Sequence, residues 1–289
     1  MISGLFLLVG GPSQEVILKL RVPELLITLS YGGVLALAGG VFQNALKNPL
    51  AEPYTLGVAS GSALGATIFL WMGLSPYWGG LLGAILTVGL LFLGLKLFKT
   101  PYSILLFGVG LSALFSSFIL LIYALLPNYT LQDAVYFTLG FIQPLSLKGA
   151  LFFTAVGALT LILGLRFKRE VELLPLGAEL AYFSGVDYNR STALLLLAFS
   201  VPVALFVSSF GVIGFLGLAA PHGVRLLGFR VGYQFILLTF ACGALFLTLS
   251  QLIGKFLLYP TLLPAGVVTG ILGAPIFLFI LWRFSGVRG

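Results

Sequence analysis

The chain has 289 residues, of which 60% are hydrophobic and only 8% are charged. Soluble domains carry about 45–50% apolar and about 25% charged residues, so this composition excludes an ordinary soluble domain and indicates a protein embedded in lipid. The net charge of +7 is better explained by the cytoplasmic bias of Lys and Arg in membrane proteins than by nucleic-acid binding. No nucleic acid is therefore expected as a partner. The single cysteine, Cys242, excludes an internal disulfide.

The N-terminal apolar stretch, Met1 to about Val9, is too short to span a bilayer and has no basic cluster before it. It is predicted to be either a short helix that dips into the outer leaflet or the remnant of a shortened first span.

Nine hydrophobic segments follow, each long enough, or nearly so, to cross about 30 Å of hydrocarbon as a helix. The apolar runs are continuous rather than alternating, which favours helices over a β-barrel. The sequence therefore predicts an all-α polytopic membrane helix bundle, with residues 1–289 forming a single transmembrane domain. The predicted spans are 25–45, 54–73, 78–98, 103–126, 147–165, 191–210, 213–228, 234–254 and 263–283.

The Lys and Arg residues divide unequally between the two sides of these spans. Eleven lie in one set of connections, and four lie in the other set: Lys19, Arg21, Lys148 and Lys255. Because Lys and Arg favour cytoplasmic loops, the C-terminus is predicted to be cytoplasmic and residues 15–24 to lie outside. The long polar connection 166–190 is then cytoplasmic. It leaves two groups of four spans that start from opposite sides, which would suit an inverted repeat.

The acidic residues are all assigned to connections. Glu24 precedes the first full span and Glu52 lies in a loop, so no carboxylate is predicted inside a span. Proton-coupled carriers usually keep ionisable groups in their spans, so proton-driven transport is disfavoured. The sequence also has no phosphate loop, HExxH motif or Cys/His cluster, so we expect no catalytic residue, metal site or cofactor in this chain. The only histidine, His222, is interpreted as a structural hydrogen-bonding residue rather than a ligand.

Glycines form a ridge of small residues in the second predicted span. Gly57, Gly61 and Gly65 lie at i, i+4 and i+8, a pattern that allows helices to pack closely in membranes. Close packing is the preferred interpretation, and a substrate-lining role is the alternative.

Three stretches are too specific to be generic membrane helix. The first combines LRVP (20–23), LALAGGVFQ (35–43), NPLAEP (48–53) and Leu56-Gly57; the second is GVIGFLGLAAPHGVR (211–225); the third is LPAGVVT (263–269) followed by GAP (273–275). Together they resemble, in order and spacing, the permease family of ABC importers that take up iron–siderophore complexes, haem and cobalamin. The resemblance covers about residues 20–283.

This resemblance implies a permease subunit in a prokaryotic cytoplasmic (inner) membrane. It implies a homodimer of permeases, two cytoplasmic ATPase subunits that bind ATP and Mg, and an extracytoplasmic substrate-binding protein. The expected substrate is a metal chelate, with an iron–siderophore or haem preferred over cobalamin or an oxyanion. Family members have ten spans, so this chain departs from the family in its first span.

The resemblance also assigns residues to contacts with these partners. The ATPase-coupling motif is carried over to Leu176, Gly177, Ala178, Glu179, Ala181 and Gly185 within the loop 166–190. Arg21 and Lys255 match basic residues that pair with glutamates of the binding protein, and such rim charges chiefly steer docking. The alternatives are a solvated amphipathic loop for the first set and interfacial snorkelling for the second.

For the pathway, the resemblance places the helix at about 103–126 along the dimer axis. Cytoplasmic gates are expected at Asn48, Pro49 and Leu50 and at Thr100 and Ser103, where prolines prevent regular helix. Candidates to line the pathway share one face of that helix: Val109, Ala113, Ser116 and Ser117. The alternative is that this face only packs against neighbouring helices.

Two other functions stay open at this point. A channel or facilitator without an ATPase would leave the loop 166–190 without a partner. A membrane scaffold would have no solvent-accessible path along 103–126.

Overall fold

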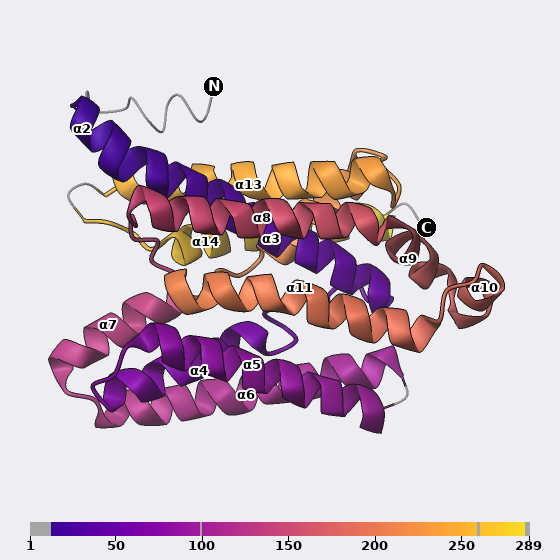
Figure 1. The fold of residues 1–289 in the computed structure, drawn as a ribbon, viewed down its shortest axis with the longest axis horizontal. Coiled ribbons are helices and arrows are strands. Elements are labelled where there is room, and N and C mark those ends of the chain that lie inside the picture. The colour runs from indigo at the N-terminus through magenta and orange to yellow at the C-terminus, as the bar shows by residue number, and fades with distance from the viewer. Residues whose placement is uncertain (1–12, 99, 259–260, 287–289) are drawn as a thin grey trace.

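The computed structural model describes residues 13–98, 100–258 and 261–286, and within them the chain forms a helical bundle without strands (Figure 1). The prediction made for Met1 to Val9 lies outside the described residues. The elements are α2 (Gln14–Val16), a π-helical turn η1 (Ile17–Arg21), α3 (Val22–Ala45), α4 (Val58–Trp71), α5 (Pro76–Leu97), α6 (Pro101–Leu125), α7 (Asn128–Thr138), α8 (Leu147–Arg166), α9 (Lys168–Leu173), a 3₁₀ turn η2 (Leu174–Leu176), α10 (Ala178–Phe183), α11 (Tyr188–Phe210), α12 (Leu216–Leu226), α13 (Tyr233–Phe256) and α14 (Ala265–Gly286).

The predicted all-α membrane bundle is confirmed, and each of the nine predicted spans overlaps one of these helices. Six helices of the described chain are long and apolar enough to cross a membrane. Two of the predicted spans are wrong in length, because α4 has 14 residues and α12 has 11. Each short helix begins at a residue in the left-handed region, Gly57 (φ 86°) and Phe215 (φ 65°), so the apolar residues just before it are not helical.

The first span begins earlier than predicted. Gln14–Ala45 forms one apolar helical stretch of 32 residues, in which η1 is a local widening. Glu24 therefore lies inside the helix and is buried. The prediction that no carboxylate lies within a span is wrong for this residue.

Helix α3 is the centre of the bundle, with contacts to α8, α11, α12 and α13. Glycines permit these contacts, because a Cβ on Gly32 would overlap the Gly243 backbone of α13, and one on Gly39 would overlap the Gly217 backbone of α12. Gly61 and Gly65 of α4 likewise abut the backbone of α5. The close-packing interpretation of the small ridge therefore holds for these two glycines.

The helix contacts support the predicted inverted repeat. Helix α3 packs on α12 and α13, and α11 packs in the same way on α4 and α5. Helix α4 packs on α5 and α6, as α12 packs on α13 and α14. Exchanging α3–α6 with α11–α14 thus preserves these neighbour relations, while α3 and α11 run in opposite directions through the bundle (Figure 1). The two groups of four helices are repeats of opposite orientation.

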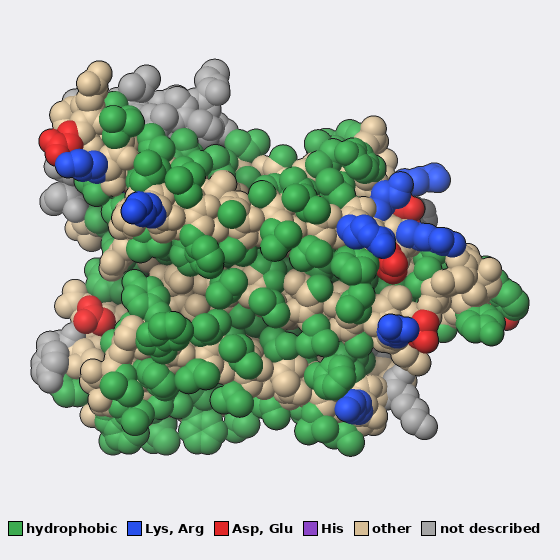
Figure 2. Space-filling view, viewed as in Figure 1, with side chains coloured by type: hydrophobic (Ala, Val, Ile, Leu, Met, Phe, Trp, Pro, Cys, Tyr) green, Lys and Arg blue, Asp and Glu red, His purple; other side chains and the backbone are tan. Residues whose placement is uncertain are grey.

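The bundle has two distinct ends. One, here called the α10 end, carries α9 and α10; the other, the α7 end, carries α2, α7 and the α13–α14 connection (Figure 1). Lys and Arg side chains gather mainly at the α10 end (Figure 2), where α8 ends at Arg166 and α11 begins beside Arg190. Lys148 and Lys255 lie at the opposite ends of their helices, towards the α7 end. The described members of the two predicted sets of basic residues therefore lie at opposite ends of the bundle, and Lys99 and Arg288 lie outside the described residues.

Candidate functional site

A compact segment between α8 and α11 projects from the α10 end (Figure 1). It consists of α9, η2 and α10, and Val171, Leu174 and Ala181 anchor it because their side chains are completely buried. Arg169 adds a hydrogen bond from Nη2 to the Ser184 carbonyl (2.5 Å). The segment is therefore a folded unit fixed to the bundle rather than a solvated loop.

Glycine closes α10 at its C-terminal side. Gly185 has φ 77°, a conformation that glycine adopts without strain, and its N–H donates to the Tyr182 carbonyl (2.8 Å). The Val186 N–H donates to the Ala181 carbonyl (2.8 Å). These bonds satisfy the last carbonyls of a helix that is only six residues long.

The outer surface of this segment is apolar although it projects beyond the bundle. Tyr182 is 76% exposed and Phe183 is 78% exposed, and Leu176 and Leu180 are more than half exposed. Figure 2 shows hydrophobic atoms at this tip, beyond the Lys and Arg side chains of the same end. Exposed aromatic side chains on a rigid support are typical of protein-binding surfaces. We refer to Leu176, Leu180, Tyr182 and Phe183 as the α10 knob.

The structure separates the six predicted coupling residues into two groups. Leu176, Ala178 and Glu179 are exposed and available to a partner. Ala181 is completely buried, and Gly177 and Gly185 shape the backbone at either end of α10 with positive φ. The first group offers exposed side chains to a partner. The second group supports the segment, because Ala181 is buried and Gly185 is exposed only through its backbone. Sequence reasoning missed Tyr182 and Phe183, although two adjacent aromatics in a polar loop were the available signal.

The two predicted gate turns also lie at the α10 end. Asn48 Oδ1 accepts a hydrogen bond from the Leu50 N–H (2.9 Å), which fixes the turn around Pro49. Thr100 caps α6 by accepting from the Ser103 N–H (3.1 Å). Both turns are thus ordered by local hydrogen bonds, and their function as gates stays a prediction.

Lys47 connects the first of these turns to the coupling segment. It adopts φ 49°, and its Nζ lies 5.3 Å from the centre of the Tyr188 ring at the start of α11. A Cβ added to Gly177 would lie 3.2 Å from the same Nζ. The turn before α4 and the segment before α11 therefore contact each other through a lysine side chain.

One face of α6 is left uncovered by the described residues of the chain. On the neighbouring face, Ser112 Oγ donates to the Tyr54 carbonyl (3.1 Å), and a Cβ on Gly108 would overlap the backbone of Leu56. Among the predicted pathway residues, Val109, Ala113 and Ser117 are exposed and Ser116 is partly exposed. They share a face, as predicted, and the described residues leave Val109, Ala113 and Ser117 exposed; whether they line a pathway stays a prediction.

At the α7 end, the two predicted docking residues belong to one cluster that joins α3 to α13. The Arg21 guanidinium lies 5.8 Å from the centre of the Phe256 ring. Lys255 forms an ion pair with the buried carboxylate of Glu24. Gln251 Nε2 donates to the other oxygen of that carboxylate (2.6 Å). Glu24 and Gln251 were not predicted as site residues.

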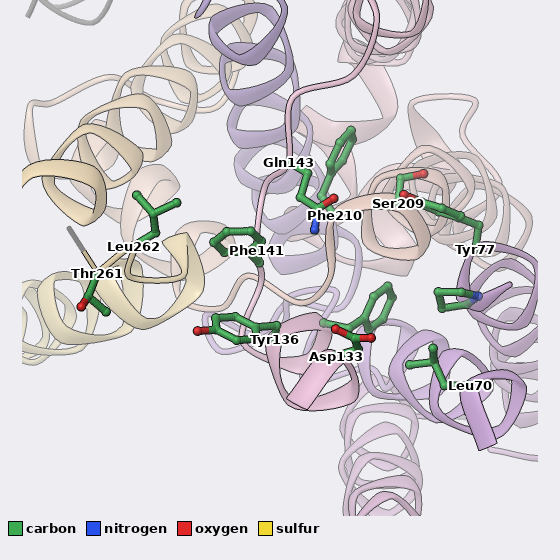
Figure 3. Close-up of a pocket in the computed structure, with 12 residues that line it drawn as sticks. Leu70, Tyr77, Asp133, Tyr136, Phe141, Gln143, Ser209, Phe210, Thr261 and Leu262 are labelled. Carbon is green, nitrogen blue, oxygen red and sulfur yellow. The ribbon is translucent and has the colours of Figure 1, made fainter. Parts of the chain in front are cut away.

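A larger cavity of about 660 Å³ opens at the same end. Figure 3 shows that its walls come from the ends of α4 and α11, the start of α5, helix α7, and the α13–α14 connection. Aromatic rings alternate in its lining with hydroxyl, amide and carboxylate groups: Tyr77, Asp133, Tyr136, Phe141, Gln143 and Ser209. It shares Phe141 and Leu262 with the smaller cavity beside Glu24 and Lys255, so the two cavities adjoin.

A polar network inside the bundle holds α12 against the end of α3. Arg225 donates to Gln43 Oε1 (2.6 Å) and to Asn44 Oδ1 (3.2 Å), and its guanidinium lies 4.9 Å from the centre of the Phe235 ring. Gln43 Nε2 in turn donates to the Gly217 carbonyl (2.8 Å). The sequence placed Gln43 and Arg225 in separate motifs without indicating that they meet.

Glu52 lies in a loop, as predicted, but it is buried. Its carboxylate lies against Gly217 and accepts a hydrogen bond from the Leu218 N–H in the first turn of α12. The positive end of the helix dipole offsets part of the cost of burying a carboxyl group here. His222, in the same helix, makes a hydrogen bond from Nδ1 to the Leu218 carbonyl (2.8 Å) and packs on Phe277, which confirms its structural interpretation. The described residues contain no group of three or more His, Cys, Asp or Glu side chains that could hold a metal ion.

Comparison with known proteins agrees with this architecture. The chain is 33% identical to the vitamin B12 import system permease protein BtuC of Vibrio cholerae, over 93% of this chain and 83% of that protein. It is 30% identical to the hemin transport system permease protein HmuU of Yersinia pestis, over 92% of this chain and 83% of that protein. A solved inward-facing metal-chelate type ABC transporter covers 98% of the chain, and the chain covers 95% of it, with a TM-score of 0.90 and 28% identity. Residues 2–283 match the FecCD transport family, and the chain is therefore a member of that family of membrane transport permeases.

Proposed function

We propose that this chain is the non-catalytic, membrane-spanning subunit of an ATP-driven importer for a metal chelate. In this proposal, ATP and Mg bind to two separate cytoplasmic ATPase subunits, and an extracytoplasmic protein delivers the substrate. The α10 end of the bundle faces the cytoplasm, the α7 end faces outward across a prokaryotic inner membrane, and the C-terminus of the chain is cytoplasmic. The excess of Lys and Arg at the α10 end supports this orientation.

The observation that carries the proposal is the α10 knob. An importer without its own ATP site needs a rigid contact through which an ATPase can move the membrane helices. The α10 knob presents apolar side chains on a segment whose anchors are fully buried, and it lies at the end opposite to Arg21 and Lys255. Seats for an ATPase and for a binding protein at opposite ends are what such an importer requires.

The pathway is proposed to form between two copies of this chain. The uncovered face of α6 carries Val109, Ala113, Ser116 and Ser117, and a second copy placed against it would enclose a passage lined by small side chains. Such a lining suits a bulky chelate that must pass without binding tightly. The cavity at the α7 end adjoins the docking cluster, so a substrate released there would enter beside it.

The substrate class is inferred from the relatives named above, which carry hemin and vitamin B12, and from the metal-chelate transporter of the same fold. An iron–siderophore or haem is the preferred substrate.

The proposal is tested with the protein co-expressed with its neighbouring genes and extracted in mild detergent. A native mass of two permeases plus two ATPase subunits is expected, together with ATP-dependent uptake of ferric hydroxamate, haemin or cobalamin by proteoliposomes. A particle of this chain alone that passes solute without ATP would establish a facilitator instead. A scaffold would show no thiol labelling at Val109→Cys or Ser117→Cys in a Cys242→Ser background, with Ile119→Cys as the buried control.

A further inference from the structure

The cluster at the α7 end contains a carboxylate where docking to an acidic partner calls for positive charge only. Glu24 is 1% exposed and lies in the first turn of α3. Lys255 lies in the last turn of α13, 231 positions along the chain from Glu24, with its side chain 26% exposed. The fold has therefore placed a buried anion directly behind the more accessible cation.

Both oxygens of the Glu24 carboxylate are engaged. One pairs with Lys255 Nζ, and the other accepts from Gln251 Nε2 (2.6 Å), which also lies 3.5 Å from the Ile142 carbonyl. Two such partners hold the carboxylate in position, because moving it would leave a buried charge unpaired. Glu24 is thus a fixed counter-charge for Lys255.

This pairing changes the electrostatics of the surface. Arg21, Glu24 and Lys255 together carry one net positive charge per subunit, whereas the two basic residues alone would carry two. An acidic side chain that approaches Lys255 must share it with Glu24 and experiences repulsion from the carboxylate behind it. The adjoining cavity of about 270 Å³ is lined by Arg21, Glu24, Gln251 and Lys255, so an incoming side chain can reach the pair.

We infer that Glu24 is an intrasubunit counter-ion that competes with the binding protein for Lys255 and so lowers the affinity of docking. Arg21 then carries most of the positive charge that attracts the acidic partner. A weaker resting contact lets the binding protein leave after it has delivered its substrate. The inference rests on the proposed function, because it concerns docking of that partner.

The test measures binding of the substrate-free extracytoplasmic binding protein of the proposed importer to the permease–ATPase complex in nanodiscs. The salt is about 0.15 M, where the Debye length is about 8 Å. Glu24→Gln keeps the shape and the bond to Gln251 but removes the charge, and it is expected to tighten docking about tenfold. Glu15→Gln is the matched control. It removes the same charge from an exposed pair with Lys19 at the same end of the bundle, and it should change docking less than about twofold.

A double variant separates competition from simple positioning of the lysine, and it tests the inference even if Glu24→Gln fails to fold. Glu24→Gln with Lys255→Met replaces an ion pair by a neutral pair of similar volume, an exchange that is often neutral for folding. If the charges of Glu24 and Lys255 cancel in docking, the affinity of this double variant for the binding protein stays within about threefold of the wild-type affinity.

Unchanged or weaker docking by folded Glu24→Gln would overturn the inference, and so would a loss of about tenfold or more in the double variant. If the wild-type complex binds no binding protein at all, the proposed function fails instead.

Discussion

Truncation of Phe183 to alanine tests whether the α10 knob binds an ATPase. The ring is 78% exposed, and an aromatic side chain of about 200 Å² therefore offers about 150 Å² to a partner. At about 25 cal/mol per Å², complete burial would contribute about 4 kcal/mol. Alanine keeps the Cβ contact and a groove seldom covers the whole ring, so about half, or 2 kcal/mol, is the expected loss. That loss corresponds to an affinity about 30-fold lower.

The assay is equilibrium binding of the purified ATPase subunit to the permease in nanodiscs, with thermal unfolding of each variant as a check on folding. Phe152→Ala is the matched control. Phe152 is also exposed and also makes an edge contact with an adjacent aromatic, as Phe183 does with Tyr182, but it lies on the outer face of α8. If Phe183→Ala binds the ATPase as the wild type does, or if Phe152→Ala weakens binding equally, the knob is not the ATPase seat.

Three further predictions concern stability and coupling. Gly61→Ala places a Cβ against the Thr87 hydroxyl of α5 and should destabilise the fold by about 1–3 kcal/mol, whereas Gly89→Ala enters open space and should not, as thermal unfolding in detergent would show. Arg225→Met leaves its two amide acceptors without a donor and should cost about 1–3 kcal/mol in the same measurement, with Arg225→Lys recovering only part. Arg169→Ala removes the hydrogen bond to the Ser184 carbonyl at the end of α10, and it should lower transport per ATP hydrolysed without lowering the melting temperature. The control Lys168→Ala removes a partly exposed ion pair with Glu172 (3.9 Å) and should change neither the transport ratio nor the melting temperature.

Hydropathy located the long helices and also the two short ones, α4 and α12, but it did not locate where the short ones begin. Leu56, Val212 and Ile213 are as apolar as helical residues and are buried, yet they lie in non-helical backbone before α4 and α12. A hydrophobicity pattern indicates which residues are buried, but it does not indicate whether their backbone is helical or extended. The positive φ angles at Gly57 and Phe215 mark where α4 and α12 begin. A phenylalanine gives no sequence signal for such an angle.

Contacts between distant residues were the part of the site that a single sequence could not provide. The motifs contained Arg21, Gln43 and Arg225, but their partners depend on which helices pack together. Glu24 was assigned to the solvent because it precedes the most apolar run, whereas the helix in fact starts ten residues earlier, at Gln14. The argument that no acid lies in a span therefore fails, although the pairing with Lys255 gives Glu24 a reason to be buried other than proton transport.

The proposed ATPase-binding surface and the proposed docking surface for the binding protein, at opposite ends of the bundle, are connected through helix α3. Glu24 and Gln43 lie about 29 Å apart along α3, at 1.5 Å per residue. Near its start α3 is held to α13 by the Glu24–Lys255 pair, and near its end it is held to α12 through Gln43 and Arg225. Between these points the close glycine contacts leave no space for sliding. A docking force at one end must therefore move α3, α12 and α13 together, because a packed unit of this kind shifts as a rigid body rather than by bending along its length.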